Sequence, residues 1–254
     1  MKAIKILPFL LPILLSSCVE RTHKKEIEQR AVIEPDSVYV HEDGTVCHAQ
    51  SPINILSSEQ KDGKHNITFS FKDEINSVEN LGHTVQVDFK IGSTVEVDGE
   101  TFEFKQAHFH TPSEHLIDGV TYPMEMHVVN TLKGQEAGQE TEFLVLGFLF
   151  KMGDSNPFVS HVLNSVPEEE NAIKEVDLGE IQFSDFIEEG DDLLGHYYHY
   201  KGSLTTPPYS ETVRWYVTKN IYEASPNQIT SILNIEGVNA RHIQGINDRT
   251  IETE

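Results

Sequence analysis

Apolar and polar residues alternate along much of this chain, with the period of two that is typical of β-strands with one buried face. The pattern is clearest at residues 85–89, 95–97, 102–104 and 213–217, and residues 143–150 form a continuous apolar run. A run of that kind is consistent with a strand that is buried on both faces. The pattern predicts a mainly β fold with a large, mostly antiparallel central sheet.

Helix signals are few and short. Asn156 followed by Pro157 is typical of an N-cap and first turn, and predicts a helix to about Val166. Ser225 followed by Pro226 predicts another helix, to about residue 233. These elements are expected at the periphery of the sheet.

Composition and charge narrow the classes of partner. Hydrophobic residues make up 38% of the 254 residues, which is enough for a sizeable core. Lys and Arg number 19 against 41 Asp and Glu, a net charge of −22. Nucleic acid is excluded as a partner, because binding phosphates requires basic patches. The acidic residues are scattered apart from residues 168–170, which indicates a soluble, self-repelling surface.

Residues 1–17 have the pattern of a signal peptide. Lys2 and Lys5 precede an apolar segment, residues 6–15, which prolines interrupt and which is too short to span a bilayer. The segment ends in Leu-Ser-Ser before Cys18, similar to a bacterial lipobox, in which the cysteine becomes the lipidated first residue. The alternative is ordinary secretory cleavage nearby, with Cys18 incidental.

The polar, charged residues that follow are typical of a tether. We therefore expect a lipidated Cys18 and tether over residues 18–36, and one folded domain over residues 37–254. A lipid on Cys18 would anchor the protein to a bacterial membrane outside the cytoplasm, in the periplasm or at the cell surface. If Cys18 carries lipid, the sequence has no second cysteine with which Cys47 could form a disulfide within the chain. Cys47 is either a buried thiol or forms an intermolecular disulfide. The second alternative would link two chains as a homodimer.

The candidate chemistry is concentrated in three histidines. Residues two apart in a strand point the same way, so His108 and His110 would project from one face, roughly 7 Å apart. Gln106 is expected on that face too, with Phe102 and Phe104 before it. The loop at residues 111–123 is long enough to return the chain as an antiparallel neighbour. His127 would then complete a triangle of imidazoles without a fourth protein ligand, which is typical of a catalytic zinc site with one open position.

Several further motifs join this pattern. They are Gln50-Ser-Pro-Ile-Asn54, Gly82-His83-Thr84, Gln106-Ala-His108-Phe-His110, Ser113-Glu114-His115, Glu125-Met-His127, Leu204-Thr205-Thr206-Pro207-Pro208, Val213-Arg-Trp215 and Asn239-Ala-Arg241. In this order they resemble the alpha-class carbonic anhydrases of bacteria, from about residue 50 to residue 249. The resemblance implies a twisted central sheet, with the metal at the bottom of a conical cleft.

The resemblance also implies a reaction, the reversible hydration of carbon dioxide to bicarbonate and a proton. One zinc ion per chain would be bound by His108, His110 and His127. In the carbonic anhydrases themselves, zinc lowers the pKa of its bound water to about 7, so that hydroxide forms at neutral pH. The enzyme would be a lyase, a carbonate dehydratase.

Other family roles can be assigned residue by residue. Gln106 and Glu125 share strand faces with His108 and His127, and the resemblance makes them the acceptors that orient these imidazoles. For His110 it implies the backbone carbonyl of Asn239.

The remaining roles concern the hydroxide, the proton and the substrate. The family aims its hydroxide with a threonine and a buried glutamate, which match Thr205 and Glu114. His83 matches the histidine that shuttles the proton, although Leu81 stands where many members have a polar Asn, which puts the efficiency of the shuttle in doubt. The positions that match the apolar substrate pocket are Val129, Val145, Leu204, Thr206, Val213 and Trp215. The other histidines His161, His196 and His199 are expected to be solvated or to serve in packing.

Two other functions share this sequence pattern. A catalytically silent relative used as a binding module would be expected to lack zinc histidines, and all three are present here. A zinc hydrolase acting on esters would use the same site, so the sequence leaves it open as a side activity. A hydration assay with and without a chelator separates the active enzyme from the silent relative.

Overall fold

The structure is a computed structural model that describes residues 39–40, 44, 46–72, 75–136, 138–186 and 196–254. The predicted signal peptide, lipidated Cys18 and tether lie outside these residues, so the domain boundaries stay predictions. In the described part of the chain, neither α-helix has the length and apolar character needed to cross a membrane.

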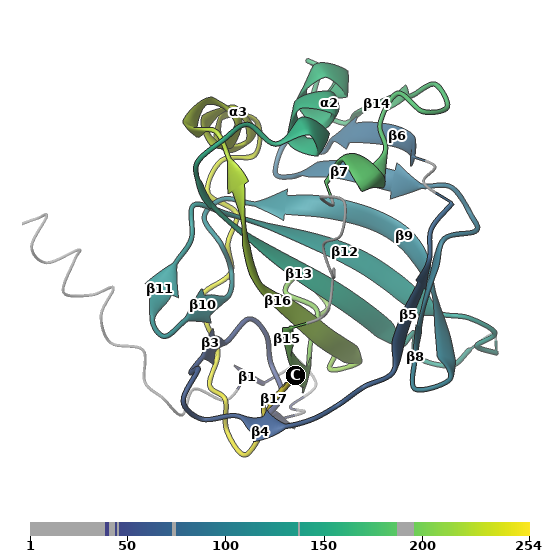
Figure 1. Cartoon of the computed structure of the whole chain (residues 1–254). Helices are drawn as coiled ribbons and strands as arrows, with labels where there is room; N and C mark the ends of the chain where they lie inside the picture. Colours follow the sequence, from purple (N-terminus) through teal and green to yellow (C-terminus); the bar gives the residue numbers. More distant parts are fainter. Residues whose placement is uncertain (1–38, 41–43, 45, 73–74, 137, 187–195) are drawn as a thin grey trace, which may run out of the picture. The chain divides into compact units, whose positions relative to one another are not determined.

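A sheet of 12 strands forms the framework of the described domain (Figure 1). Across the sheet, the strands are β14 (Ala172–Glu175), β6 (Ile75–Asn80), β7 (Val85–Phe89), β9 (Glu100–His110), β12 (Met124–Leu132), β13 (Phe143–Met152), β16 (Val213–Ala224), β15 (Tyr197–Gly202), β17 (Glu252–Thr253) and β4 (Lys61–Asp62). Two more, β5 (Ile67–Ser70) and β8 (Thr94–Val97), pair with each other, and β8 also pairs with β9. Only β13 with β16 and β17 with β4 pair in parallel among the described strands of this sheet.

Short strands form two smaller sheets. β1 (Tyr39–Val40) pairs with β2 (Val46–Cys47), while β10 (Leu116–Ile117) pairs with both β11 (Val120–Thr121) and β3 (Asn54–Ile55). A short 3-10 helix, η1, spans Phe183–Asp185. The prediction of a mainly β fold with short peripheral helices on a large, mostly antiparallel sheet is confirmed.

Both predicted helices are present, and their caps are the residues that the sequence indicated. In α2 (Pro157–Ser165) the side chain of Asn156 accepts a hydrogen bond from the backbone N–H of Val159. In α3 (Pro226–Glu236) Ser225 and Gln228 form a capping box. This second helix runs to Glu236, beyond the predicted end, and stops where Gly237 takes a positive φ of 70°.

A β-bulge in β9 corrects one expectation from the sequence. The pairing of β9 with β12 shifts register so that Lys105 has no opposing residue. A bulge reverses the alternation of side chains, so the residues before it face the side opposite to His108. The core cluster on that opposite side contains Phe102, Phe104, Ala107 and Phe109. The prediction that Phe102 and Phe104 share the face of His108 is therefore wrong.

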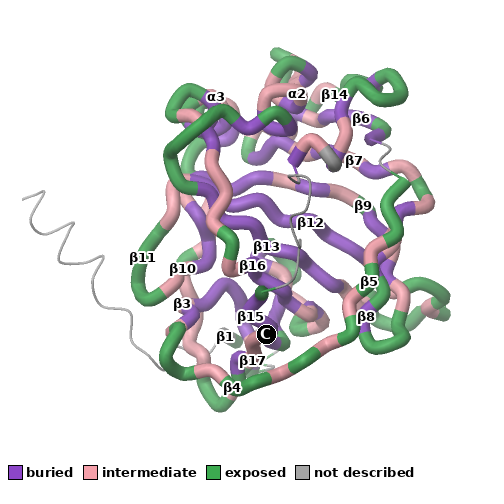
Figure 2. The backbone as a smooth tube through the Cα atoms, viewed as in Figure 1, coloured by how far each residue is buried: buried purple, intermediate pink, exposed green. Residues whose placement is uncertain are grey.

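The sheet is covered on one face by aromatic packing and by the helices. Phe158 of α2 and Ile232 of α3 belong to the large apolar cluster under β7, β9 and β12, and the central strands are buried over most of their length (Figure 2). A second, smaller apolar cluster lies on the opposite face and includes Val145, Trp215 and Val217. The candidate site lies on this second face.

Candidate active site

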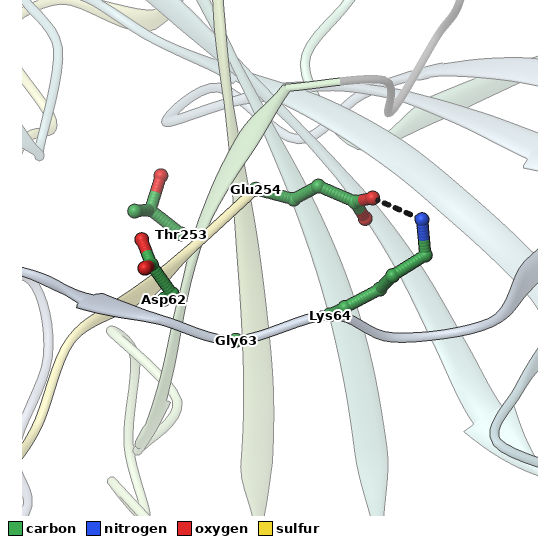
Figure 3. Close-up of a pocket in the computed structure, with 5 residues that line it drawn as sticks. All are labelled: Asp62, Gly63, Lys64, Thr253 and Glu254. Atoms are coloured by element: carbon green, nitrogen blue, oxygen red, sulfur yellow. Dashed lines mark ion pairs between the residues drawn. The ribbon is translucent and has the colours of Figure 1, made fainter.

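One hollow in the described surface is a poor candidate for the chemistry. It measures about 420 Å³ and is lined by Asp62, Gly63, Lys64, Thr253 and Glu254, at β4 and β17 (Figure 3). Lys64 and Glu254 pair across it at 2.9 Å, and both side chains are solvent-exposed in part. The strands β13, β16 and β15 separate it from the histidines of β9 and β12.

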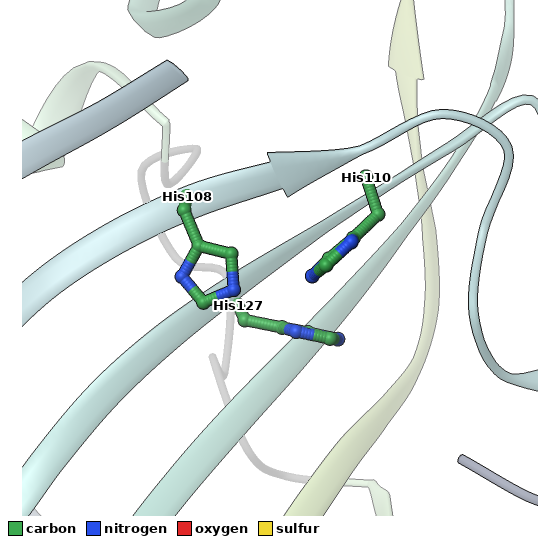
Figure 4. Close-up of side chains that lie close together, drawn as sticks. All are labelled: His108, His110 and His127. Carbon is green, nitrogen blue, oxygen red and sulfur yellow. The ribbon is translucent and has the colours of Figure 1, made fainter. Parts of the chain in front are cut away.

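The three predicted histidines meet on the face of the sheet that carries the second, smaller apolar cluster. His127 of β12 lies directly opposite His108 of β9, and His110 lies two residues further along. The ring centroids are 4.9 Å apart for His108 and His110, 5.3 Å for His108 and His127, and 4.6 Å for His110 and His127. One nitrogen of each ring lies within 4.8 Å of the others, and the rings converge (Figure 4). The spacing suits three ligands of one metal ion.

Two of the rings are oriented by acceptors that the sequence indicated. Nδ1 of His108 lies 2.8 Å from Oε1 of Gln106, and Nε2 of His127 lies 2.8 Å from Oε1 of Glu125. Because an oxygen acceptor holds the proton on that nitrogen, the other nitrogen carries the lone pair. His108 therefore offers Nε2, and His127 offers Nδ1.

His110 differs from what the family resemblance implied. Both of its ring nitrogens are buried and have no hydrogen-bond partner, and the carbonyl of Asn239 does not reach them. Instead, the side chain of Asn239 accepts from the N–H of Thr111 at 3.0 Å and donates to the carbonyls of Phe109 and His83. It holds the end of β9 rather than the imidazole. An unpartnered buried imidazole is unfavourable, and a cation between the three rings would satisfy it.

Burial favours the neutral form of His108 and of His110. It lowers the pKa of His108 to about 3, helped by the nearby His127. Burial also lowers the pKa of His110 well below its usual range, with His127 and His108 acting in the same direction. Neutral imidazole is the form that binds a metal, so His108 and His110 are in the form that can act as metal ligands at neutral pH.

Glu125 joins His127 to a histidine whose role the sequence did not reveal. Its Oε1 lies 2.7 Å from Nδ1 of His115, and its Oε2 accepts from the backbone N–H groups of Glu114 and His115, both at 2.8 Å. Burial alone would raise the pKa of Glu125, but His115 and His127 hold it well below its usual range. The carboxylate is thus fixed by four contacts.

The contacts continue away from the site through buried groups. Nε2 of His115 lies 2.7 Å from the hydroxyl of Tyr200, which in turn lies 3.0 Å from Oγ of Ser51. Trp215 packs edge-on against both His115 and His127, with centroids 4.8 Å apart in each case. The only signal for His115 in the sequence was its place in the Ser-Glu-His motif, since no spacing rule links it to Glu125 or Tyr200.

The structure brings Glu114 and Thr205 together. Glu114 is 1% exposed, and its Oε1 accepts from the N–H of Arg241 at 2.8 Å. Burial raises the pKa of this carboxyl to about 8, although hydrogen bonds from Arg241 and Thr205 lower it in part. Its Oε2 lies 3.5 Å from Nε2 of His110, so a dication on the histidines would favour the ionised carboxylate.

His83 lies near the end of β9, where Asn239 donates to the carbonyls of both His83 and Phe109. Its side chain is exposed, and Nδ1 lies 2.9 Å from the carbonyl of Leu81, which leaves Nε2 toward solvent. The next residue, Thr84, donates from its hydroxyl to the carbonyl of Phe109, which lies between His108 and His110 in the sequence. The structure thus places a solvated imidazole close to the strand that carries the site.

The predicted pocket residues other than Thr206 belong to the apolar cluster on the face of His127 or pack against it. Val129, Val145 and Trp215 are neighbours across β12, β13 and β16. Val213 belongs to the same apolar cluster, and Leu204 packs against it. Thr206 is exposed, at the turn that Tyr209 closes by donating its N–H to the Thr206 carbonyl. An apolar wall beside the histidines suits a small apolar substrate.

Comparison with known proteins agrees with this arrangement. Residues 41–254 match the model of the eukaryotic-type carbonic anhydrase family. The carbonic anhydrase of Neisseria gonorrhoeae is 35% identical over 209 residues, which cover 80% of this chain and 76% of the relative. The carbonic anhydrase of a Nostoc species is 32% identical over 206 residues, covering 80% and 74%.

A solved structure gives the same result. The alpha-carbonic anhydrase of Thermovibrio ammonificans, in complex with the inhibitor sulfanilamide, superposes with a TM-score of 0.71 at 36% identity, covering 80% of this chain and 86% of that one. The match extends over most of both chains, and the sequence resemblance is confirmed. The chain therefore belongs to the alpha (eukaryotic-type) carbonic anhydrase family, and it is a carbonic anhydrase.

Proposed function

We propose that this carbonic anhydrase binds one zinc ion per chain through Nε2 of His108, one nitrogen of His110 and Nδ1 of His127. The observation that carries the proposal is the convergence of three buried imidazoles, of which His110 has no partner for either nitrogen. Nitrogen ligands of this number suit zinc with one position left open. When bound, zinc supplies the Lewis acidity that makes a water molecule nucleophilic at neutral pH.

The protein then orients the reacting oxygen. Glu114, ionised and held by the N–H of Arg241, accepts a hydrogen bond from the Thr205 hydroxyl, which keeps its proton. A hydroxyl has one proton to donate, so Thr205 can only accept from the attacking oxygen. A lone pair of that oxygen is thereby directed toward carbon dioxide, which rests against Val129, Val145 and Trp215.

A proton must leave after each turnover, and we assign its transfer to His83. The imidazole is exposed at the rim, its Nδ1 is engaged by the Leu81 carbonyl, and Nε2 is available to accept and release a proton. Histidine suits this role because its ordinary pKa is near neutrality. The side chain of Leu81 offers no polar group to hold a chain of water molecules. We therefore expect slower proton transfer than a polar side chain at this position would give.

The sequence supports a location for this activity. We propose that Cys18 carries lipid and anchors the enzyme to a bacterial membrane, with the catalytic domain outside the cytoplasm. Support comes from the short apolar segment and the Leu-Ser-Ser that precede Cys18.

The central experiment is a stopped-flow assay of carbon dioxide hydration with the purified domain, before and after removal of metal by a chelator. We expect activity that is lost with the metal and restored by one equivalent of zinc. Hydration that persists at full rate without metal would contradict the zinc assignment. A protein that binds zinc but does not hydrate carbon dioxide would be a silent relative.

A further inference from the structure

A second cluster of metal-binding side chains lies at the edge of the sheet, apart from the site above. It consists of His65, which precedes β5, His199 of β15 and Glu252 of β17. One ligand atom of each lies within 4.8 Å of the others. Nε2 of His65 and Oε2 of Glu252 are 3.1 Å apart, and the two imidazole centroids are 4.7 Å apart. The strands β16 and β13 separate this cluster from β12 and His127.

The protons of both imidazoles are held on the outer side of the cluster. Nδ1 of His65 lies 2.6 Å from Oδ2 of Asp98, and Nδ1 of His199 lies 2.8 Å from the backbone carbonyl of Trp215. For His199 the carbonyl at Nδ1 places the proton there and the lone pair on Nε2; for neutral His65, which has an acceptor at each nitrogen, the shorter contact to Asp98 favours the same tautomer over a proton shared with Glu252 at 3.1 Å. Two imidazole lone pairs and one carboxylate are then the groups that face each other. Without a cation or an added proton between them, this arrangement is repulsive.

The backbone brings these groups together with little freedom. Gly63 donates its N–H to the carbonyl of Thr253 at 3.0 Å, which fixes β17 beside the segment that leads to His65. A Cβ atom at Gly63 would lie 2.7 Å from Cβ of Glu252, so only glycine permits this close approach. The N–H of His65 donates to the hydroxyl of Tyr197 at 3.1 Å. His199 itself is buried and stacks on Tyr216 at 4.2 Å.

We propose that His65, His199 and Glu252 bind a divalent transition-metal ion, with Asp98 and the Trp215 carbonyl orienting the two imidazoles. Two nitrogens and one carboxylate oxygen suit zinc, copper or nickel better than calcium or magnesium. Ligand atoms about 2.1 Å from a metal in tetrahedral geometry are about 3.4 Å apart, so atoms now within 4.8 Å of one another have to close by under about 1.5 Å. Glu252 keeps 39% of its side chain exposed, so the ion can enter from solvent and retain water.

The site joins segments that are far apart in the chain. A metal ion there links the segment before β5 to β15 and to β17, near the C-terminal end of the domain. Binding to the folded state alone stabilises it by mass action. We therefore expect the metal to raise thermal stability, while the hydration site remains unchanged.

One competing account has the same geometry without a metal. His65 could carry two protons, forming an imidazolium that lies between Asp98 and Glu252. That account predicts no affinity for zinc, whereas the proposal predicts a second equivalent. Metal binding therefore decides between them.

The test is a zinc titration of the full folded domain. The protein is first loaded with one equivalent of zinc and desalted. Further zinc is then added in competition with a chromophoric chelator. We expect a second equivalent to bind. His65→Gln and Glu252→Gln should each weaken that second step at least about tenfold, as loss of one ligand requires. The matched controls His161→Gln, on α2, and Glu254→Gln, two residues beyond Glu252 and just past the end of β17, should retain it. Hydration activity should be the same in all four variants.

A thermal-shift measurement and a spectroscopic one accompany the titration. Added zinc should raise the melting temperature of the wild type and the controls but not of His65→Gln or Glu252→Gln. Copper(II) added to the zinc-loaded protein should give an electron paramagnetic resonance spectrum with two coupled nitrogens. The proposal is overturned by a single zinc equivalent in the wild type, by a second equivalent that survives both ligand substitutions, by its loss in the controls, or by a copper spectrum without two nitrogens.

Discussion

Oε1 of Glu125 lies 2.8 Å from Nε2 of His127, and this one contact determines which nitrogen of the imidazole faces the metal site. With Nε2 bound to the carboxylate, only Nδ1 can act as a ligand. His108 has the opposite arrangement, because Gln106 holds its Nδ1. The three-histidine site thus depends on acceptors that stand outside it.

Loss of a ligand should remove the metal. His110→Ala takes away the imidazole that has no hydrogen-bond partner, and we expect zinc content to fall from about one per chain to near zero, together with hydration activity. Inductively coupled plasma mass spectrometry of the purified protein measures this. His161→Ala, on α2, should keep both, and a fully zinc-loaded triple alanine variant at His108, His110 and His127 would refute the ligand assignment.

Glu125→Gln tests the orienting carboxylate without changing its size. A neutral amide oxygen accepts more weakly from His127 and His115 than a carboxylate oxygen does, and the NH2 group cannot accept from the two backbone N–H groups that bind Oε2, so the ligand nitrogen becomes less basic. We expect zinc to bind roughly 10 to 100 times more weakly. Competition with a chelator gives the dissociation constant. Zinc affinity equal to that of the wild type would show that the contact is structural.

The proton path predicts a buffer effect. His83→Ala should lower turnover in weak buffer, and small imidazole buffers should restore it, because they can carry the proton instead. The ratio of turnover to KM should change little, since the hydration step does not use this path. Equal losses in both quantities without rescue would assign His83 a structural role.

The anchor can be tested at the N-terminus. Cys18→Ser should release a soluble protein or leave an unprocessed precursor, with the catalytic constants of the purified domain unchanged, because a polar tether separates Cys18 from the fold. Mass spectrometry of the mature wild-type N-terminus should find lipidated Cys18. An unmodified N-terminus at another residue would support ordinary secretion.

Glu236 makes stability depend on pH. Burial raises the pKa of this carboxyl to about 8, although hydrogen bonds from Thr111 and Val85 oppose the shift. Between the ordinary value near 4.5 and about 8, the folded state keeps a proton that the unfolded state has lost, so stability falls as pH rises, by up to about 1.4 kcal/mol per pH unit. Glu236→Gln should remove this part of the slope in urea unfolding from pH 5 to pH 9. Glu140→Gln, an exposed position, should leave the slope as it is.

Sequence reasoning found the elements of the site that obey simple periodicity. Strand alternation placed His108 and His110 together, and N-cap chemistry placed the starts of α2 and α3. It failed at Lys105, because a bulge is a local backbone choice that no polar or apolar pattern marked. It missed the link from Glu125 through His115 to Tyr200, which depends on three segments meeting in space. The grouping of His65, His199 and Glu252 escaped it for the same reason.

The pairing of β9 with β12 is a local contact in the chain, and we expect it to form earlier in folding than the contacts around Glu114. Only residues 111–123 separate these two strands in the chain, so the three imidazoles can meet once this one local strand pair has formed. The contact that fixes Glu114, by contrast, joins it to Arg241 across 127 positions of sequence. Closing so long a loop is slow compared with forming a local pair. We therefore expect the refolding chain to bring the three histidines together before the groups that orient the reacting oxygen, so that metal binding would precede the appearance of activity.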